Sequence, residues 1–356
     1  MSFNTFGKTF MPSAPLAENE KYSFTNCDTG RNIRVNGEEF FVFKNGNVTI
    51  GEKEYTVLPL KNCRYKLYNT TSYLKDTDEG DTCDASLADE LSDISAINCC
   101  WYATKEGENE PLRMMIAGDS ITLGASGDLP ETQFWGCRPA LTQLIGFDPA
   151  NRFVSVGSMK DVESSEDDTA LFRHEGHGGW MAEDIYRPIY HRWEEDRGLN
   201  TFMEGWQLKY KPDVVLIQLG TNDCAFASGR DPQHESEWDD KTMTGVMDRW
   251  ANLFELMWRV KPDLKVIVAT APPTTRSECL NNWFIEFNKR VVTYVEKWKA
   301  MGREVIFADT NTAIYNSDAK RGLCSDQIHL SPAGYHAMAG VYYTKFLEMF
   351  PDGVGR

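Results

Sequence analysis

The sequence lacks several features that would indicate a membrane or nucleic-acid partner. No apolar run is long enough to span a bilayer. Basic residues are the minority, because 37 Lys and Arg face 53 Asp and Glu and give a formal net charge of −16. No basic stripe interrupts this negative charge, so a polyanion such as a nucleic acid would be repelled. The first fifteen residues contain neither a basic start nor an apolar segment, so no signal peptide is expected there.

The nine cysteines do not form a metal-binding pattern. None belongs to a CxxC pair, and no Cys/His spacing suits structural zinc. Their odd number leaves at least one thiol unpaired in a monomer. Five of them precede residue 111, and the triplets starting at Asn47 and Asn69 match glycosylation sequons. We therefore expect a secreted protein, with a cytoplasmic location as the alternative.

The chain of 356 residues is longer than one hydrophobic core usually serves, so two domains are expected. Residues 1–20 are expected to be a leader that is unstructured or wraps the fold. Residues 21–108 contain short β-prone segments, one pair of which flanks the turn signal Asn45-Gly46. These residues predict a small, mainly antiparallel β module, with an acidic loop at 76–93.

The remainder, residues 109–356, alternates between two kinds of pattern. Short apolar runs predict buried strands at 112–117, 152–157, 214–219, 265–271 and 304–308. Helical spacing predicts helices at 134–145, 243–260 and 283–301, and a last helix with Ser331 as N-cap and Pro332 at its first position. Five strands alternating with helices predict a doubly wound parallel sheet.

The most informative stretch is 112–126, where an apolar run ends at Gly118-Asp119-Ser120. The hydroxyl of Ser120 is therefore expected at the carboxyl end of a strand, where open α/β sheets place their chemistry. Asp and Ser also cap helices well, so a helix cap is the structural alternative. Three further polar stretches follow later strands, at 173–180, 220–223 and 326–329.

These stretches contain what acyl transfer by a serine requires, namely a base, a group that orients the base, and donors for the oxyanion. Asp326 and His329 are three residues apart and share a face in a turn or short helix. Asn222 offers a side-chain amide, and a glycine lets its backbone N–H approach a ligand closely. Each stretch alone could be a turn, a cap or a flexible loop, but the four in this order favour catalysis. No set of residues suits a metal or a nucleotide phosphate.

The order Gly118-Asp119-Ser120, Gly179, Gly220-Thr221-Asn222-Asp223, Asp326-Gln327-Ile328-His329 resembles the SGNH (GDSL-type) hydrolase superfamily. The resemblance covers residues from about 112 to 350. It implies a flavodoxin-like three-layer α/β/α fold with no cofactor.

The same resemblance implies a role for each matching residue. Ser120 would be the nucleophile, His329 the general base and then the acid, and Asp326 the group that orients His329. The oxyanion hole would consist of the backbone N–H groups of Ser120 and Gly179 and the side chain of Asn222, with Gly176 and Gly178 as neighbouring alternatives to Gly179.

The stretch 174–180, HEGHGGW, resembles the corresponding region of acetylxylan esterases of carbohydrate esterase family 3. This implies removal of acetyl groups from a plant polysaccharide such as xylan, so an acetylated polysaccharide or oligosaccharide is the expected partner. A β module before such a domain also resembles carbohydrate esterase family 2. Trp180 and Asp119 are candidate substrate-binding residues, although Trp180 could instead pack the loop.

Two other functions stay open at this point. One is a general short-chain carboxylesterase or lipase of the GDSL type. The other is a carbohydrate-binding protein with a vestigial esterase site, which the occupied catalytic positions argue against.

Overall fold

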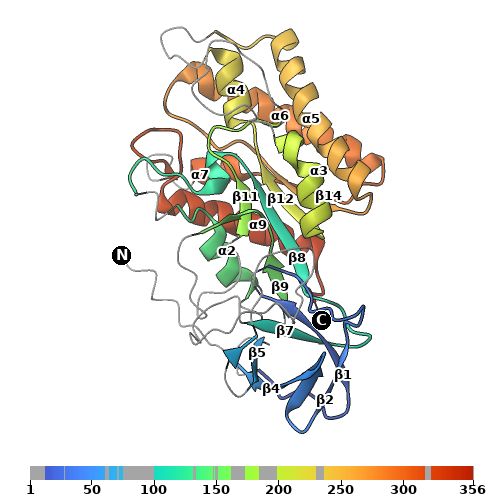
Figure 1. The fold of residues 1–356 in the computed structure, drawn as a ribbon. Helices are drawn as coiled ribbons and strands as arrows, with labels where there is room; N and C mark the ends of the chain where they lie inside the picture. The colour runs from blue at the N-terminus through green and yellow to red at the C-terminus, as the bar shows by residue number, and fades with distance from the viewer. Residues whose placement is uncertain are drawn as a thin grey trace.

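The computed structural model describes residues 13–27, 29–60, 64–69, 72–74, 100–130, 134–146, 148, 151–161, 173–183, 199–229, 236–316 and 322–355. Within them the chain forms two sheets of seven strands each. The first sheet belongs to an N-terminal β barrel and the second to an α/β domain (Figure 1).

The barrel is antiparallel and follows the strand order β4-β3-β2-β1-β7-β5-β6. Its strands are β1 (Lys21–Asn26), β2 (Phe41–Lys44), β3 (Asn47–Ile50), β4 (Lys53–Pro59), β5 (Arg64–Asn69), β6 (Ser72–Tyr73) and β7 (Trp101–Lys105). A further pairing between β4 and β5 closes it. Asn45 and Gly46 both have positive φ, as a tight hairpin turn requires, so the predicted hairpin is confirmed.

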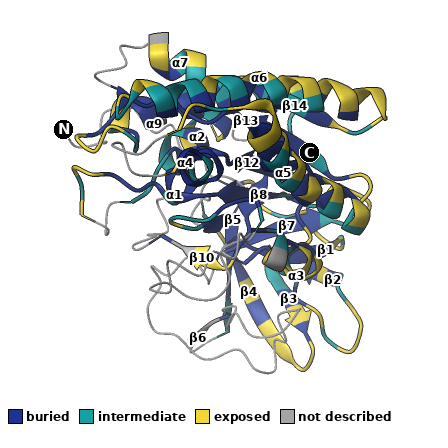
Figure 2. Cartoon of the chain, turned by 90° about the horizontal axis from the view of Figure 1, so that it is seen from above, coloured by how far each residue is buried: buried dark blue, intermediate teal, exposed yellow. Residues whose placement is uncertain are grey.

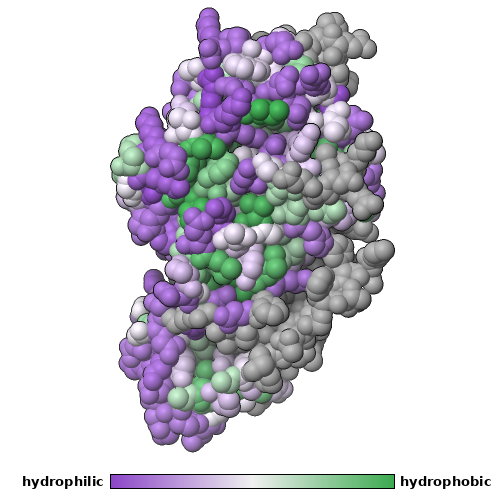
Figure 3. Space-filling model, turned by 180° about the vertical axis from the view of Figure 1, so that it is seen from behind, coloured by the Kyte–Doolittle hydropathy of each residue, from purple (hydrophilic) through white to green (hydrophobic). Residues whose placement is uncertain are grey.

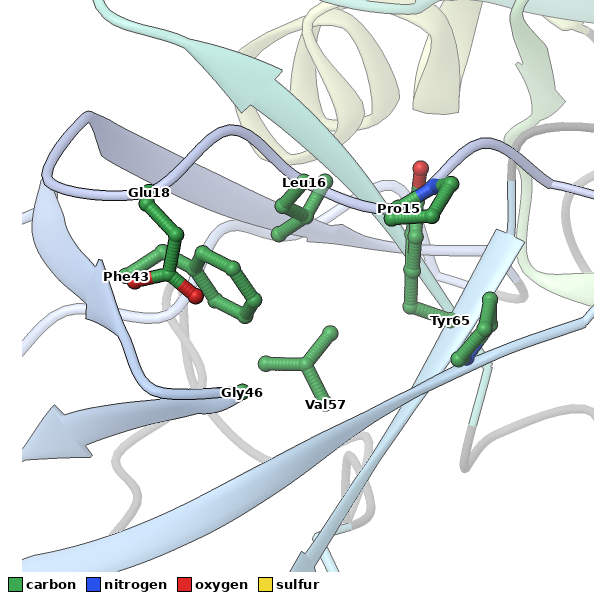
Figure 4. Close-up of a pocket in the computed structure, with 8 residues that line it drawn as sticks. Pro15, Leu16, Glu18, Phe43, Gly46, Val57 and Tyr65 are labelled. Atoms are coloured by element: carbon green, nitrogen blue, oxygen red, sulfur yellow. The ribbon is translucent and has the colours of Figure 1, made fainter.

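The end of the leader, from residue 13 on, lies along the barrel. The backbone N–H of Ser13 donates to the carbonyl of Leu60 at 2.8 Å, and the Tyr65 hydroxyl donates to the carbonyl of Ala14 at 2.6 Å. Residues 1–12 lie outside the described part. A cavity of about 400 Å³ lies between the described end of the leader and the barrel (Figure 4). It is lined by Pro15, Leu16, Glu18, Phe43, Gly46, Val57, Pro59 and Tyr65. None of these residues is a candidate catalytic residue.

The second sheet is mainly parallel, in the order β10-β11-β8-β12-β13-β14. Its strands are β8 (Leu112–Gly118), β9 (Phe153–Ser155), β10 (Met159–Lys160), β11 (Arg173–Gly176), β12 (Val214–Gln218), β13 (Lys265–Ala269) and β14 (Val305–Ala308). Along one edge of β8, β9 pairs in parallel with its first residues and β11 with its last two. Only β10 runs antiparallel, against β11.

Helices cover both faces of this sheet and complete the predicted three-layer architecture. They are α1 (Ser120–Leu123), α2 (Arg138–Ile145), α3 (Leu199–Tyr210), α4 (Thr221–Ser228), α5 (Asp240–Val260), α6 (Glu278–Ala300), α7 (Thr310–Asn316) and α9 (Pro332–Met349). Residues of α3, α4, α5 and α6 share a core with one face of the sheet, and those of α2, α7 and α9 share a core with the other. The central strands β8, β12 and β13 are almost entirely buried, while the long helices α5 and α6 expose their outer sides (Figure 2).

The structure adds elements that the sequence pattern did not predict. The segment 173–176, expected to follow a strand, is itself the strand β11, and α3, α4 and α7 are additional helices. Helix α6 begins at Glu278, with Ser277 as N-cap, rather than at residue 283. The final helix has Ser331 as N-cap and Pro332 as its first residue, as predicted. The acidic stretch 76–93 lies outside the described residues.

Two arginines join the barrel to the amino end of β8. Arg113 Nε donates to the carbonyl of Gly30 at 3.1 Å. Arg152 donates through Nη1 to the carbonyl of Ala103 at 3.1 Å and through Nη2 to the carbonyl of Asn109 at 2.7 Å. Since β8 has seven residues, these contacts lie about 20 Å from its carboxyl end. The barrel is therefore attached at the end of the sheet opposite Ser120 (Figure 1).

The hydrophilic character of the surface agrees with the charged composition of the sequence. Seen from behind, the two ends of the molecule are mainly hydrophilic, with apolar patches between them (Figure 3). In the part of the chain that the structure describes, no helix combines the length and apolar character needed to cross a membrane.

Candidate active site

Ser120 lies where strand β8 turns into helix α1. Asp119 is the N-cap of that helix and Ser120 its first residue. As the first helical residue, Ser120 has no helical acceptor for its backbone N–H, which stays available to a ligand. Gly118 has a φ of 155°, and a Cβ at this position would overlap the carbonyl oxygen of Gln218. Only glycine therefore lets β8 approach β12 so closely just before the serine.

His329 connects Ser120 with Asp326. The distance from His329 Nε2 to Ser120 Oγ is 2.9 Å, and the distance from His329 Nδ1 to Asp326 Oδ2 is 2.7 Å. The other carboxylate oxygen, Oδ1, accepts the backbone N–H groups of Ile328 and His329, each at 2.9 Å. Partial burial raises the pKa of Asp326, but the hydrogen bonds from the His329 ring and these two N–H groups outweigh it, so the pKa lies below its ordinary value. Asp326 is therefore ionised and holds the ring.

The turn that carries Asp326 and His329 is fixed by its own backbone. The N–H of Cys324 donates to the carbonyl of His329 at 2.8 Å, and the N–H of Gln327 donates to the carbonyl of Cys324 at 3.0 Å. Gln327 adopts a φ of 64°, in the left-handed region. This tight turn places the carboxylate of Asp326 against one nitrogen of the His329 ring while the other nitrogen reaches Ser120, and helix α9 begins only afterwards.

Two residues that the sequence did not single out support this turn from other segments. The carboxylate of Asp128 accepts the backbone N–H of Ser325 at 3.2 and 3.3 Å. Thr274 Oγ1 donates to the carbonyl of Gln327 at 2.7 Å. Both act on backbone groups, which any residue type presents, so no pattern in the sequence indicates these contacts.

The stretch 173–180, called the block-two segment from here on, forms strand β11 and a tight turn after it. The backbone N–H of His177 donates to the carbonyl of Gly118 at 3.0 Å, which ties this turn to the strand that precedes Ser120. Gly176 belongs to the strand, and a Cβ there would overlap the backbone of Leu123. Gly179 has a φ of 79°, and a Cβ there would have no neighbour within 4 Å. Of the glycines considered, Gly176 has a packing role and Gly179 lies beside open space.

Asn222 is the second residue of α4, at the carboxyl end of β12. Its side-chain Nδ2 donates to the carbonyl of Trp180 at 2.9 Å, so the block-two turn fixes its orientation. A primary amide has two N–H donors, and this contact uses one of them. The next residue, Asp223, is buried and its Oδ1 accepts the N–H of Ala182 at 3.2 Å. Burial raises the pKa of Asp223 to about 6.

Asp119 does not lie where a substrate could reach it. Its side chain is fully buried, and Oδ1 accepts the backbone N–H of Ile121 at 2.9 Å. Burial, helped by the nearby Asp223, raises the pKa of Asp119 to about 7, against hydrogen bonds that lower it. The expectation that Asp119 binds substrate is therefore corrected, because the residue is buried and caps helix α1.

Trp180 belongs to a cluster of aromatic rings beside the block-two turn. Its ring stacks on His177, with a centroid distance of 4.1 Å and an angle of 17°. Phe202 and Trp206, one turn apart on α3, complete the cluster, with centroids 5.3 and 6.3 Å from that of Trp180. The sequence pattern does not single out these two residues, because it predicts no helix at α3.

A buried ionic network contacts the end of helix α1. The guanidinium of Arg138 binds both oxygens of Asp161, at 2.8 and 2.5 Å, and donates to the carbonyls of Thr122 and Leu123 at the end of α1. His174 Nε2 lies 3.3 Å from Asp161 Oδ1. Burial and then the neighbouring arginine lower the pKa of His174 to about 4, so this histidine is neutral near pH 7. Within the described ranges, no group of three or more His, Cys, Asp and Glu side chains could hold a metal ion.

A comparison with known families identifies the α/β domain. The profile of the GDSL-like lipase/acylhydrolase family matches residues 116–337. The chain belongs to this family. A curated relative, a multidomain esterase from Ruminococcus flavefaciens, is 24% identical over 253 residues, which are 67% of this chain and 28% of that protein. The chain thus spans less than a third of the length of that relative.

Solved structures with a similar fold include two family 3 carbohydrate esterases. The one from Clostridium thermocellum is 21% identical with a TM-score of 0.49, covering 68% of this chain and 98% of that chain. The one from Talaromyces cellulolyticus is 24% identical with a TM-score of 0.49, covering 68% of this chain and 99% of that chain. Membership of the family depends on the profile match and not on these likenesses.

Proposed function

We propose that this chain is a serine esterase that removes O-acetyl groups from a plant polysaccharide such as acetylxylan. The observation that carries the proposal is the hydrogen-bonded relay from Ser120 through His329 to Asp326, with distances of 2.9 and 2.7 Å. A serine hydroxyl is a weak nucleophile until an adjacent base accepts its proton. In this arrangement the imidazole is in contact with that hydroxyl and the carboxylate holds its other nitrogen.

The proposed reaction has two steps. Ser120 Oγ attacks the ester carbonyl while His329 Nε2 takes its proton, and the sugar hydroxyl then leaves with that proton. Water next attacks the acetyl-enzyme by the same route and releases acetate. Asp326 keeps the His329 ring in the tautomer that presents its unprotonated Nε2 to Ser120.

The oxyanion of each tetrahedral intermediate requires hydrogen-bond donors that are already in place. We assign this role to the backbone N–H groups of Ser120 and Gly179 and to the second N–H of Asn222. All three belong to segments at the carboxyl edge of the sheet, and Trp180 orients the amide of Asn222.

The substrate class is supported by the residues around the relay. The stretch 174–180 resembles the corresponding region of acetylxylan esterases, and the aromatic rings of Trp180, Phe202 and Trp206 gather beside Gly179. Aromatic rings combine a large apolar face with a polar edge, which suits contact with a sugar ring. The net charge of −16 does not disfavour a neutral polysaccharide. Such a polymer lies outside the cell, so the proposal includes secretion.

The decisive experiment compares the wild type with Ser120→Ala for acetate release from acetylated xylan. Release by the wild type alone is the expected result. Release by both would refute the assignment of the nucleophile. If neither acts on xylan, small aryl acetates test the chemistry separately, and silence there as well would favour a carbohydrate-binding protein with a vestigial site.

A general short-chain carboxylesterase is the second candidate, because the family comprises lipases and acylhydrolases in general. A series of aryl esters from acetyl to octanoyl distinguishes the two. A deacetylase should show a steep fall in rate from acetyl to butyryl, whereas similar rates on long acyl chains would favour the second candidate. Covalent labelling of Ser120 by an organophosphate would exclude a vestigial site.

A further inference from the structure

The turn that carries Gly179 is held by a buried carboxylate. Glu175, the third residue of β11, is fully buried. Its Oε1 accepts the backbone N–H of Ser158, and its Oε2 accepts the hydroxyl of Ser158 at 2.7 Å. The same Oε2 lies 3.0 Å from His177 Nε2. A buried carboxylate is stable only when such donors satisfy it, so Nε2 of His177 carries the proton and donates it to Glu175.

His177 is restrained at three further points. Its backbone N–H donates to the carbonyl of Gly118 at 3.0 Å, and its carbonyl accepts the N–H of Trp180 at 3.2 Å, which closes the turn around Gly178 and Gly179. Its ring stacks on Trp180 and also on Trp206, at 5.1 Å and an angle of 1°. The ring and the backbone of His177 are therefore fixed together.

The same turn also controls Asn222, another of the proposed oxyanion donors. The carbonyl of Trp180 accepts one N–H of Asn222 at 2.9 Å, so a shift of Trp180 would rotate the amide. The position of Gly179 and the orientation of Asn222 thus depend on one short segment, and His177 starts that segment.

We infer that Glu175 and His177 are positioning residues that set the geometry of the oxyanion hole. This inference builds on the proposed function. Neither residue is assigned contact with the reacting atoms, and both act through Gly179 and Asn222. Donors that are misplaced by about 1 Å can cost about 100-fold in rate, so loss of this anchor should lower kcat far more than it changes KM.

Two substitutions at His177 separate its hydrogen bond from its stacking. His177→Phe keeps a flat ring against Trp180 and Trp206 but leaves Glu175 without this donor. His177→Gln keeps an N–H donor close to the position of Nε2 but loses the ring. We expect His177→Phe to lower kcat on an aryl acetate by about 100-fold with KM within about threefold, and His177→Gln to restore most of the loss.

A boronic acid that forms a tetrahedral adduct with Ser120 provides a readout that a merely structural role would not change. Its affinity should fall in parallel with kcat in His177→Phe. In an Asn222→Ala background the same substitution should cost less, because one of the donors it positions is already absent. The matched controls are His336→Phe and His336→Gln, on the exposed side of α9, which should leave kcat unchanged.

The outcomes separate this inference from the proposed function. A wild type without esterase activity would refute the proposed function. An active wild type whose His177→Phe variant keeps its kcat and its boronate affinity would overturn the positioning role alone, as would a rise in KM with unchanged kcat.

If His177→Phe does not fold, Ser158→Ala replaces it as the test. This variant removes one donor from Glu175 at an exposed residue. We expect it to lower kcat by roughly two- to fivefold without affecting KM. An unchanged kcat in folded Ser158→Ala would then overturn the inference.

Discussion

Replacing Asp119 with asparagine should stabilise the protein in a pH-dependent way. The carboxyl is fully buried, and burial raises its pKa from 3.8 to about 7. In the unfolded chain the pKa returns to its ordinary value near 4. The folded protein therefore binds this proton more tightly than the unfolded chain does between about pH 4 and pH 7.

The sign and size of the effect follow from that difference. Because the folded state holds the proton, raising the pH through this window lowers the free energy of unfolding. A difference of roughly 3 pKa units corresponds to about 4 kcal/mol, at 1.36 kcal/mol per unit. An asparagine side chain at this position would stay neutral at every pH, and its oxygen could still accept the N–H of Ile121.

The measurement is urea denaturation of the wild type and Asp119→Asn at pH 4.5, 6 and 7.5. The variant should be close to the wild type at the lowest pH and progressively more stable above it. Asp239→Asn is the matched control, since Asp239 is also an N-cap that accepts a backbone N–H, but it is exposed. Hydrogen bonds from Thr242 lower the pKa of Asp239, so this carboxyl is ionised in both the folded and the unfolded state above about pH 4, and its substitution should show no appreciable trend over these three pH values. A stability difference for Asp119→Asn that stays constant or shrinks with rising pH would refute the reasoning.

Three further predictions concern the proposed oxyanion hole, the relay and the buried network. Asn222→Ala should lower kcat by about 100- to 1,000-fold in steady-state assays, and a loss below about tenfold would indicate a structural role. Asp326→Asn should reduce kcat but leave turnover measurably above that of Ser120→Ala, since the imidazole remains; turnover equal to the wild type would contradict its orienting role. Arg138→Met should destabilise the fold by about 3–5 kcal/mol in chemical denaturation, because Asp161 would remain buried without its charge partner, and a loss below about 1 kcal/mol would contradict this.

The fold of the α/β domain could be predicted because its strands are apolar on both faces. In β12, alternate residues enter the two cores: Val215 and Ile217 join the core with α5, and Val214 and Leu216 join the core with α9. Such continuous apolar runs are typical of parallel strands covered on both sides. The ends of these strands then placed Ser120 and Asn222 at one edge.

Strand β11 could not be predicted in the same way, because three of its four residues, Arg173, His174 and Glu175, are polar and yet buried. The partners that make this possible, such as Asp161 for His174 and Ser158 for Glu175, are more than ten residues away in sequence. Buried polar groups are stable only when they are paired, and no local pattern shows such pairing.

The candidate site combines segments from distant parts of the sequence, because several of them meet at the backbone of Gly118. Gly118 accepts the N–H of His177 through its carbonyl, contacts β12 closely through its Cα, and precedes Asp119 and Ser120. The turn that carries Ser120, the block-two turn and the end of β12 are therefore adjacent through backbone contacts that leave no room for a side chain at Gly118. The barrel joins the opposite end of β8 through Arg113 and Arg152, so among the described residues the relay and its proposed donors belong to the α/β domain alone.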